Sequence, residues 1–230
     1  MRGLLILFSC IWVQTTFAQF GMIADKDGYV NIRKSPSISN NIISTLANDQ
    51  IVYSLGAEGK WLLVDYDFNH QIKSGYIHGS RVQFIDVFDQ IPYSNLTDSI
   101  VTFTKESLHI TATKKRFDPA DNHLQYHQAD TSTNEIGGLE KINGKAIWGT
   151  DGNIPKYQYG QFTVFMDDDT LHLPIDDLFE PNLGNTTVHI DEQNHMMYIS
   201  ATNSDGAGTY VVLWIIEEGR CKQRITTIPY

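Results

Sequence analysis

The stretch that decides the fold of the first part of this chain is DGYVNIRKSPSISNNIISTL, residues 27–46. Apolar Val30 and Ile32 alternate with polar or aromatic neighbours, which is the period of a half-buried β-strand. A Ser-Pro-Ser sequence follows at 35–37. Because proline fixes φ and removes a backbone donor, this sequence predicts that the strand ends there in a turn.

Four more runs with strand character follow this one. They lie at 51–55, 61–66, 75–78 and 82–85, with turn residues at 40–41, 48–49 and 58–59. Five short strands in about 65 residues predict a small, strongly bent barrel, because two packed sheets need more chain. Gly28 and Gly75 are expected where the backbone bends or approaches a neighbour closely.

Residues 22–86 resemble the bacterial Src-homology-3-like (SH3-like) domain. The resemblance rests on the order and spacing of short motifs: Gly-Tyr-Val-Asn-Ile-Arg from 28, Ser-Pro-Ser from 35, Ile-Ser-Thr-Leu from 43, Trp-Leu-Leu-Val from 61 and Gly-Tyr-Ile from 75. Two differences alter the rim where a ligand would bind. Tyr76 stands where the family more often has tryptophan, and residues 67–74 lengthen the preceding hairpin.

The resemblance implies a non-catalytic module of an exported or envelope protein, which binds a peptide or a cell-wall component such as peptidoglycan. The candidate ligand-binding residues are four aromatic side chains and two polar neighbours: Tyr29, Asn31, Arg33, Trp61, Tyr66 and Tyr76. In the alternative interpretation, these aromatic side chains fill and flank a small core.

The first eighteen residues have the pattern of a cleaved secretion signal. Arg2 precedes an apolar run from Leu4 to Val13, and Thr16 and Ala18 are the small residues that favour cleavage before residue 19. The run is about ten residues, too short for a helix that crosses a bilayer core of about 30 Å. We therefore expect a secreted or periplasmic protein that begins at about Gln19 and has no integral membrane segment.

The expected mature chain is acidic. Removal of residues 1–18 takes away one of 17 basic residues and none of 27 acidic ones, which gives a formal charge of 16 − 27 = −11. An acidic surface disfavours nucleic acid and anionic lipid as partners. Cys221 is then the only cysteine, since Cys10 lies in the signal, so no intramolecular disulfide is expected and a structural thiol is favoured over a nucleophile.

Residues 96–230 carry a second series of strand-like runs, and residues 87–95, with Pro92, are predicted to be a linker. Asn143-Gly144 is a strong hairpin signal, and only 175–179 has a helical pattern, of about one turn. The predicted fold class is all-β, with the small SH3-like barrel followed by an antiparallel β-sandwich or open barrel. No family resemblance is evident for this second domain.

Each catalytic or metal template lacks a required member. His123 and His127 have zinc-ligand spacing, but Leu124 stands where a zinc protease needs its glutamate. The acidic turn 167–169 lacks the spacing of a calcium loop, and Cys221 has no histidine after it. We predict no catalytic residue, metal or cofactor, although paired-carboxylate hydrolysis stays open.

The long connection 146–159 joins Trp148, Asp151 and two tyrosines, and it predicts either a ligand-binding loop or a packed corner closed by the tryptophan. The sequence thus favours an exported binding protein whose partner is a peptidoglycan peptide or another protein. The alternatives are an envelope hydrolase with an unrecognised site in the second domain, or a periplasmic inhibitor or immunity protein.

Overall fold

The computed structural model describes residues 18–69, 71–127 and 137–230. Within these ranges the chain forms twenty β-strands and five short 3₁₀ helices, with no α-helix, so the all-β prediction is confirmed. The chain divides into two compact units, here called unit 1, which ends at Val82, and unit 2, which begins at Gln83. None of the described helices is long and apolar enough to cross a membrane.

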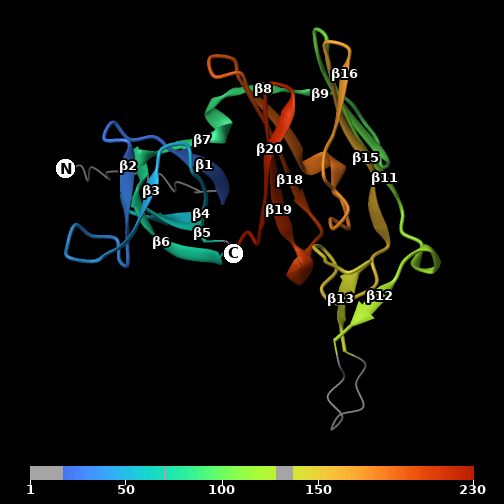
Figure 1. The fold of residues 1–230 in the computed structure, drawn as a ribbon, viewed down its shortest axis with the longest axis horizontal. Helices are drawn as coiled ribbons and strands as arrows, with labels where there is room; N and C mark the ends of the chain where they lie inside the picture. Colours follow the sequence, from blue (N-terminus) through green and yellow to red (C-terminus); the bar gives the residue numbers. More distant parts are fainter. Residues whose placement is uncertain (1–17, 70, 128–136) are drawn as a thin grey trace, which may run out of the picture. The chain divides into compact units, whose positions relative to one another are not determined.

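Unit 1 forms one curled sheet, whose last strand, β7, continues two residues past Val82 (Figure 1). Its strand order is β3-β2-β6-β5-β4-β1-β7. The strands are β1 (Gln19–Ile23), β2 (Tyr29–Arg33), β3 (Ile42–Ala47), β4 (Ile51–Glu58), β5 (Trp61–Phe68), β6 (Gln71–His78) and β7 (Val82–Phe84), with the 3₁₀ helix η1 (Gly79–Arg81) between the last two.

Alternation along the strands places the core of unit 1 inside the curl. Val30 and Ile32 are buried as predicted, with 8% and 0% of their surface exposed. On β5 the buried positions are Leu62, Val64 and Tyr66, whereas the residues between them are only half-buried. β2 and β5 therefore each present one apolar face inward and one mixed face outward.

Gly75 allows β2 and β6 to meet where the sheet curls back on itself. Arg33 and Tyr76 are the residue pair in register between these two strands. A Cβ atom at Gly75 would lie 2.4 Å from Cγ2 of Ile32 and 3.2 Å from the carbonyl oxygen of Arg33. The sequence prediction of close backbone approach at this glycine is confirmed, and Gly28 has a positive φ of 82° in the turn before β2.

Unit 2 contains two five-stranded sheets whose order is β16-β15-β11-β10-β9 and β20-β19-β18-β17-β8. The strands of the first sheet are β9 (Tyr93–Leu96), β10 (Ile100–Lys105), β11 (Leu108–Arg116), β15 (Tyr157–Met166) and β16 (Asp169–His172). Those of the second are β8 (Asp89–Ile91), β17 (Thr186–Asp191), β18 (Met196–Asn203), β19 (Tyr210–Glu217) and β20 (Arg220–Thr227).

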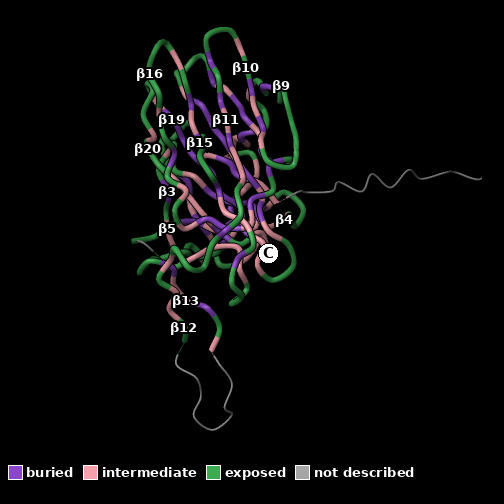
Figure 2. Tube along the Cα trace, turned by 90° about the vertical axis from the view of Figure 1, so that its right-hand side faces the viewer, coloured by how far each residue is buried: buried purple, intermediate pink, exposed green. Residues whose placement is uncertain are grey.

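The two sheets share one hydrophobic core, so unit 2 is an antiparallel β-sandwich. Phe162 of β15 packs edge-on against Trp214 of β19, with ring centroids 4.9 Å apart, and Tyr159 also contacts that indole. Figure 2 shows buried strand centres and exposed hairpin turns in this part of the chain. Four of these turns, which join β10 to β11, β15 to β16, β17 to β18 and β19 to β20, carry residues that line one hollow.

A small third sheet extends from the sandwich and contains β12 (Leu124–Tyr126), β13 (Leu139–Ile142) and β14 (Lys145–Ala146). Ile142 pairs with Lys145 across the turn, and Asn143 and Gly144 have positive φ values of 53° and 80°. The Asn-Gly hairpin prediction is therefore confirmed. The remaining 3₁₀ helices are η2 (Ile85–Val87), η3 (Pro119–Asp121), η4 (Leu183–Asn185) and η5 (Gly206–Gly208).

Two local predictions are wrong. Residues 87–95 are not a plain linker, because β8 pairs with β17 and the start of β9 pairs with β10. Residues 175–179 form no helix: Leu178 bridges to Trp148 and Phe179 to Gln158, which draws this segment into β-type pairing with distant residues. The partners of β8 and of 178–179 lie far away in the sequence, whereas β9 pairs with the next strand along the chain.

Candidate functional site

Three of the residues predicted to bind a ligand lie together on the outer face of unit 1. Arg33 and Tyr76 are in register across β2 and β6, and the Arg33 guanidinium lies 5.8 Å from the centre of the Trp61 ring. The indole also meets the ring of His78 edge-on at 5.4 Å. All four side chains are half-buried, so this outer cluster is a shallow surface with one cation on an aromatic ring.

Tyr29 and Asn31 share the outward face of β2 with Arg33, at spacings of two residues. Their register partners are Ala47 and Thr45 on β3. Tyr29 is 51% exposed, and Asn31 is half-buried. These two residues continue the outer surface along β2.

Tyr66 does not belong to that surface. It is 3% exposed and lies on the inward face of β5, opposite to Trp61. The grouping of Tyr66 with the outer residues therefore has to be corrected. The physical reason is strand geometry, because residues five apart on a regular strand point to opposite faces.

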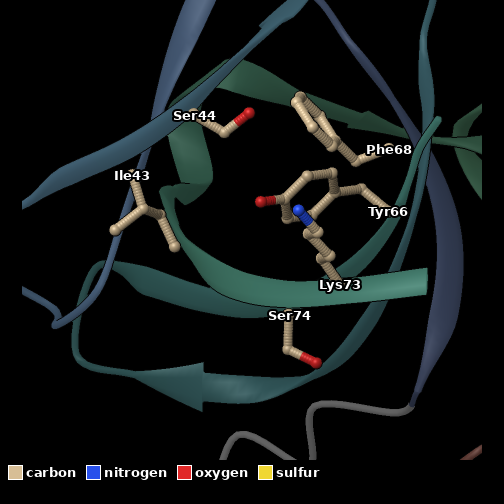
Figure 3. Close-up of a pocket in the computed structure, with 6 residues that line it drawn as sticks. All are labelled: Ile43, Ser44, Tyr66, Phe68, Lys73 and Ser74. Carbon is tan, nitrogen blue, oxygen red and sulfur yellow. The ribbon is translucent and has the colours of Figure 1, made fainter. Parts of the chain in front are cut away.

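Tyr66 instead lines a hollow of about 340 Å³ inside the curl of unit 1, here called the unit 1 pocket. Its lining residues come from β3, β5 and β6: Ile43, Ser44, Tyr66, Phe68, Lys73 and Ser74. Figure 3 shows the side chains of Tyr66, Phe68 and Lys73 reaching into this space.

The long β5–β6 hairpin builds one wall of the unit 1 pocket. Tyr66 is in register with Lys73, and Phe68 with Gln71, so the two strands stay paired to the end of the hairpin. Residues 67–74, expected to lengthen this hairpin, thus supply Phe68 and Lys73 to the pocket.

The pocket combines a cation, an aromatic ring and hydroxyl groups. The Lys73 ammonium lies 4.2 Å from the centre of the Phe68 ring, a cation–π contact. Ser44 Oγ is buried and has no hydrogen-bond partner among the described residues. Ser74 Oγ already donates a hydrogen bond to the Asp65 carboxylate, at 2.5 Å. A buried hydroxyl without a partner costs about 1–3 kcal/mol, so a ligand that bonds to Ser44 would recover that free energy.

Trp148 and Asp151 belong to unit 2 and are not among the lining residues of the unit 1 pocket. Trp148 packs against the sandwich core with its ring 6.1 Å from that of Tyr210. The backbone N–H of Trp148 donates to the backbone carbonyl oxygen of Asp177 at 2.9 Å, and its carbonyl oxygen accepts from the backbone N–H of Phe179 at 3.1 Å. Asp151 is exposed in a turn with a φ of 46°. The tryptophan therefore closes a packed corner of the sandwich.

Three tyrosine hydroxyls in the hydrophobic cores of the two units have raised pKa values. Burial raises the pKa of Tyr53 to about 12, and it raises the pKa values of Tyr159 and Tyr210 in the sandwich. Burial also raises the pKa of the Cys221 thiol, which packs against the sandwich core. Across the described ranges, no group of three or more histidine, cysteine or acidic side chains is placed to hold a metal ion.

Sequence reasoning missed Ser44, Phe68 and Lys73 as pocket residues. Phe68 and Lys73 could have been found from alternation, since each lies two residues from a position that faces inward, Tyr66 and Gly75 respectively. The same alternation places Ser44 two residues from buried Leu46 on β3, and the register of β3 on β2, in which Ser44 pairs with Ile32, agrees with that inward placement.

Comparison with known proteins identifies no relative of this chain. No protein-family model matches the chain, and no curated protein and no solved structure matches it significantly.

Proposed function

We propose that this chain is an exported, non-catalytic binding protein, in which unit 1 is an SH3-like module that binds a peptide. Peptides of the cell-wall peptidoglycan are the leading candidate. The observation that carries this proposal is the unit 1 pocket, where a lysine ammonium, an aromatic ring and an unsatisfied buried hydroxyl meet in about 340 Å³.

The chemistry of the pocket suits a peptide that carries a free carboxylate. The Lys73 ammonium would pair with the carboxylate, and charge-assisted hydrogen bonds of this kind are stronger than neutral ones. The Ser44 hydroxyl would bond to the peptide backbone or to the same carboxylate. Phe68 and Ile43 are 39% and 50% exposed, so they offer apolar surface for the adjoining side chain.

The absence of an activated nucleophile favours binding over catalysis at this pocket. Among the residues that the structure describes, its lining includes no aspartate, glutamate or histidine. Ser44 Oγ has no partner that could act as a base, and Ser74 Oγ donates to Asp65 outside the lining. Nucleophilic catalysis needs a nucleophile and a base within hydrogen-bond reach, and the described lining residues do not supply that pair.

Co-sedimentation of the full chain with purified peptidoglycan tests the proposal. Lys73→Met removes the ammonium and keeps the aliphatic stem, and we expect roughly a tenfold loss of affinity because a hydrogen bond to a charged group is lost. Lys60→Met is the matched control, since it removes one exposed lysine from the neighbouring β4–β5 turn. Wild-type affinity in this control and loss in Lys73→Met are the expected results.

Other outcomes assign the function differently. No sedimentation of the wild-type chain would remove peptidoglycan as the ligand. Loss of binding in Tyr76→Ala with retention in Lys73→Met would move the site to the outer cluster of Arg33, Trp61 and Tyr76. Equal losses in Lys73→Met and Lys60→Met would show that only the net charge of unit 1 matters.

A further inference from the structure

A second hollow, of about 580 Å³, opens at one end of the sandwich in unit 2. Its lining comes from the four hairpin turns that join β10 to β11, β15 to β16, β17 to β18 and β19 to β20, and from the strand ends beside them. We call it the unit 2 pocket. Its volume lies within the range of about 300–1,000 Å³ that is typical of small-molecule sites.

The floor of the unit 2 pocket is apolar and rich in methionine. Met166, Met196 and Met197 line it together with Leu108 and Ile216. These are three of the five methionines in the chain, and they come from both sheets of the sandwich. Methionine side chains are flexible and polarisable, and they are over-used at surfaces that adapt to apolar ligands.

The two sheets approach each other closely across this pocket. A Cβ atom at Gly219, in the β19–β20 turn, would lie 3.7 Å from the Cε atom of Met166 on β15. Leu108 and Ile216 are 6% and 2% exposed, so they form the deepest part of the floor, whereas Met166 and Met196 are half-buried and form its more accessible part. An apolar chain that enters here would contact both sheets.

The rim of the unit 2 pocket is acidic. Five carboxylates and one lysine line the pocket, which gives a formal charge of 1 − 5 = −4 with histidine neutral. The lysine, Lys105, is already paired with Glu192 at 2.6 Å, and this pairing lowers the pKa of Glu192. Asp191 is buried and accepts hydrogen bonds from Asn194.

Two rim carboxylates, Glu106 and Glu218, are exposed on the β10–β11 and β19–β20 turns, and no ion pair is recorded for either among the described residues. A third, Asp167, accepts a hydrogen bond from Ser107. Net negative charge therefore remains at the entrance, above a floor that has none.

We propose that the unit 2 pocket binds a small cationic amphiphile, with its apolar chain on the methionine floor and its ammonium head at the acidic rim. Charge complementarity selects the head group, because a carboxylate head would meet the net negative charge of the rim. The floor selects an aliphatic or aromatic chain by burying it away from water. This proposal does not depend on the function proposed for unit 1, since it concerns other residues.

Methionine methyl NMR of the full chain tests the proposal directly. The chain is labelled with ¹³C at the methionine methyl groups and titrated with three probes of equal chain length: octylammonium, 1-octanol and octanoate. Single Met→Leu variants, which nearly conserve volume, assign the signals. Met22 lies on β1 in unit 1 and is the internal reference.

We expect octylammonium to shift the signals of Met166, Met196 and Met197 saturably, with a Kd in the millimolar range that suits so small a ligand. Octanoate should bind roughly tenfold more weakly, with 1-octanol between the two. Equal affinity for octylammonium and octanoate would overturn the charge selection. Shifts that do not saturate, or that move Met22 equally, would overturn the site itself.

A pair of double variants separates the rim from the general acidity of the chain. Glu106→Gln with Glu218→Gln neutralises two exposed rim positions. Asp98→Asn with Asp205→Asn neutralises two exposed positions at the other ends of β10 and β18. We expect the rim variant to bind octylammonium roughly three- to fivefold more weakly and the control variant to bind as the wild type does. Equal weakening in both variants would refute recognition by the rim.

Discussion

Replacement of Gly75 by alanine should destabilise unit 1, because this glycine lets β6 cross β2 at close range. The added Cβ would lie 2.4 Å from Cγ2 of Ile32, whereas carbon atoms pack best at about 3.5–4.0 Å. The two strands would have to separate by roughly 1.1–1.6 Å, or Ile32 would have to leave its rotamer.

The expected cost follows from two opposing effects. Overpacking of a well-packed core costs about 1–3 kcal/mol, and the lower entropy of the unfolded chain with alanine offsets about 0.4–1 kcal/mol of it. The free energy of unfolding of unit 1 should therefore fall by about 1–2 kcal/mol. For a unit of this size, that loss lowers the Tm by roughly 5–15 °C.

Hydrogen-exchange mass spectrometry measures this loss locally, because peptides from β2 and β6 report the opening of unit 1 separately from unit 2. Gly56→Ala is the matched control: it also lies within a strand, but its added Cβ meets no atom within 4 Å. Ile32→Leu removes the clashing Cγ2 branch at similar volume, and in that background Gly75→Ala should cost far less. Equal costs at Gly56 and Gly75, or no rescue by Ile32→Leu, would refute the reasoning.

Three further predictions concern unit 2. Asp177→Asn should lower the free energy of unfolding by about 1–3 kcal/mol, because Asp177 forms a half-buried bidentate pair with Arg224 at 2.5 and 2.6 Å. Asp176→Asn breaks only an exposed pair and should cost less than about 0.5 kcal/mol in the same urea titration; equal costs would contradict the role of burial. Gly144→Ala should cost about 1 kcal/mol, measured by urea unfolding, because its φ of 80° strains any residue with a Cβ; a neutral effect would argue against the turn geometry. Burial lowers the pKa of the His189 imidazole below its ordinary 6.5, so the unfolded chain binds a proton at this residue more readily than the folded chain does. The contribution of neutral His189 to the free energy of unfolding should therefore be complete above pH 6.5 and should fall as the pH drops towards the lowered pKa. Urea midpoints between pH 7.5 and 5.5 should fall more steeply for the wild type than for His189→Gln, and parallel slopes would contradict this.

Local pattern was enough to predict much of unit 1. Alternation in 29–33 gave the buried positions of β2, and the isolated Gly75 indicated a close crossing. The same alternation separates Trp61 from Tyr66, because an odd spacing of five residues places them on opposite faces, but resemblance to a family groups both as groove aromatics. Alternation along β5 alone therefore predicts that Trp61 belongs to the outer cluster and Tyr66 to the unit 1 pocket.

Unit 2 was predictable at its turns and not at its pairings. Asn143-Gly144 predicts a two-residue hairpin turn directly, because asparagine and glycine both tolerate the positive φ values that such a turn requires. The three-residue strand β8 carries no such signal, because its partner β17 begins almost a hundred residues later in the chain. The methionines of the unit 2 pocket, at 166 and 196–197, meet only because hairpins from both sheets end at one edge of the sandwich. Composition alone cannot predict that these three side chains line one pocket.

The turns around the unit 2 pocket hold non-glycine residues in the left-handed region. Glu106, Asp167, His195 and Glu218 have φ values of 55°, 50°, 55° and 48°. Such residues persist there only where short connections between firmly paired strands demand them. Turns of this kind leave the entrance of the unit 2 pocket little conformational freedom, so the entrance would select molecules by size unless the turns rearrange. Lengthening one turn by a few residues would increase that freedom and leave the paired strands in place. These four turns are therefore the positions at which to change the size of ligand that the unit 2 pocket binds.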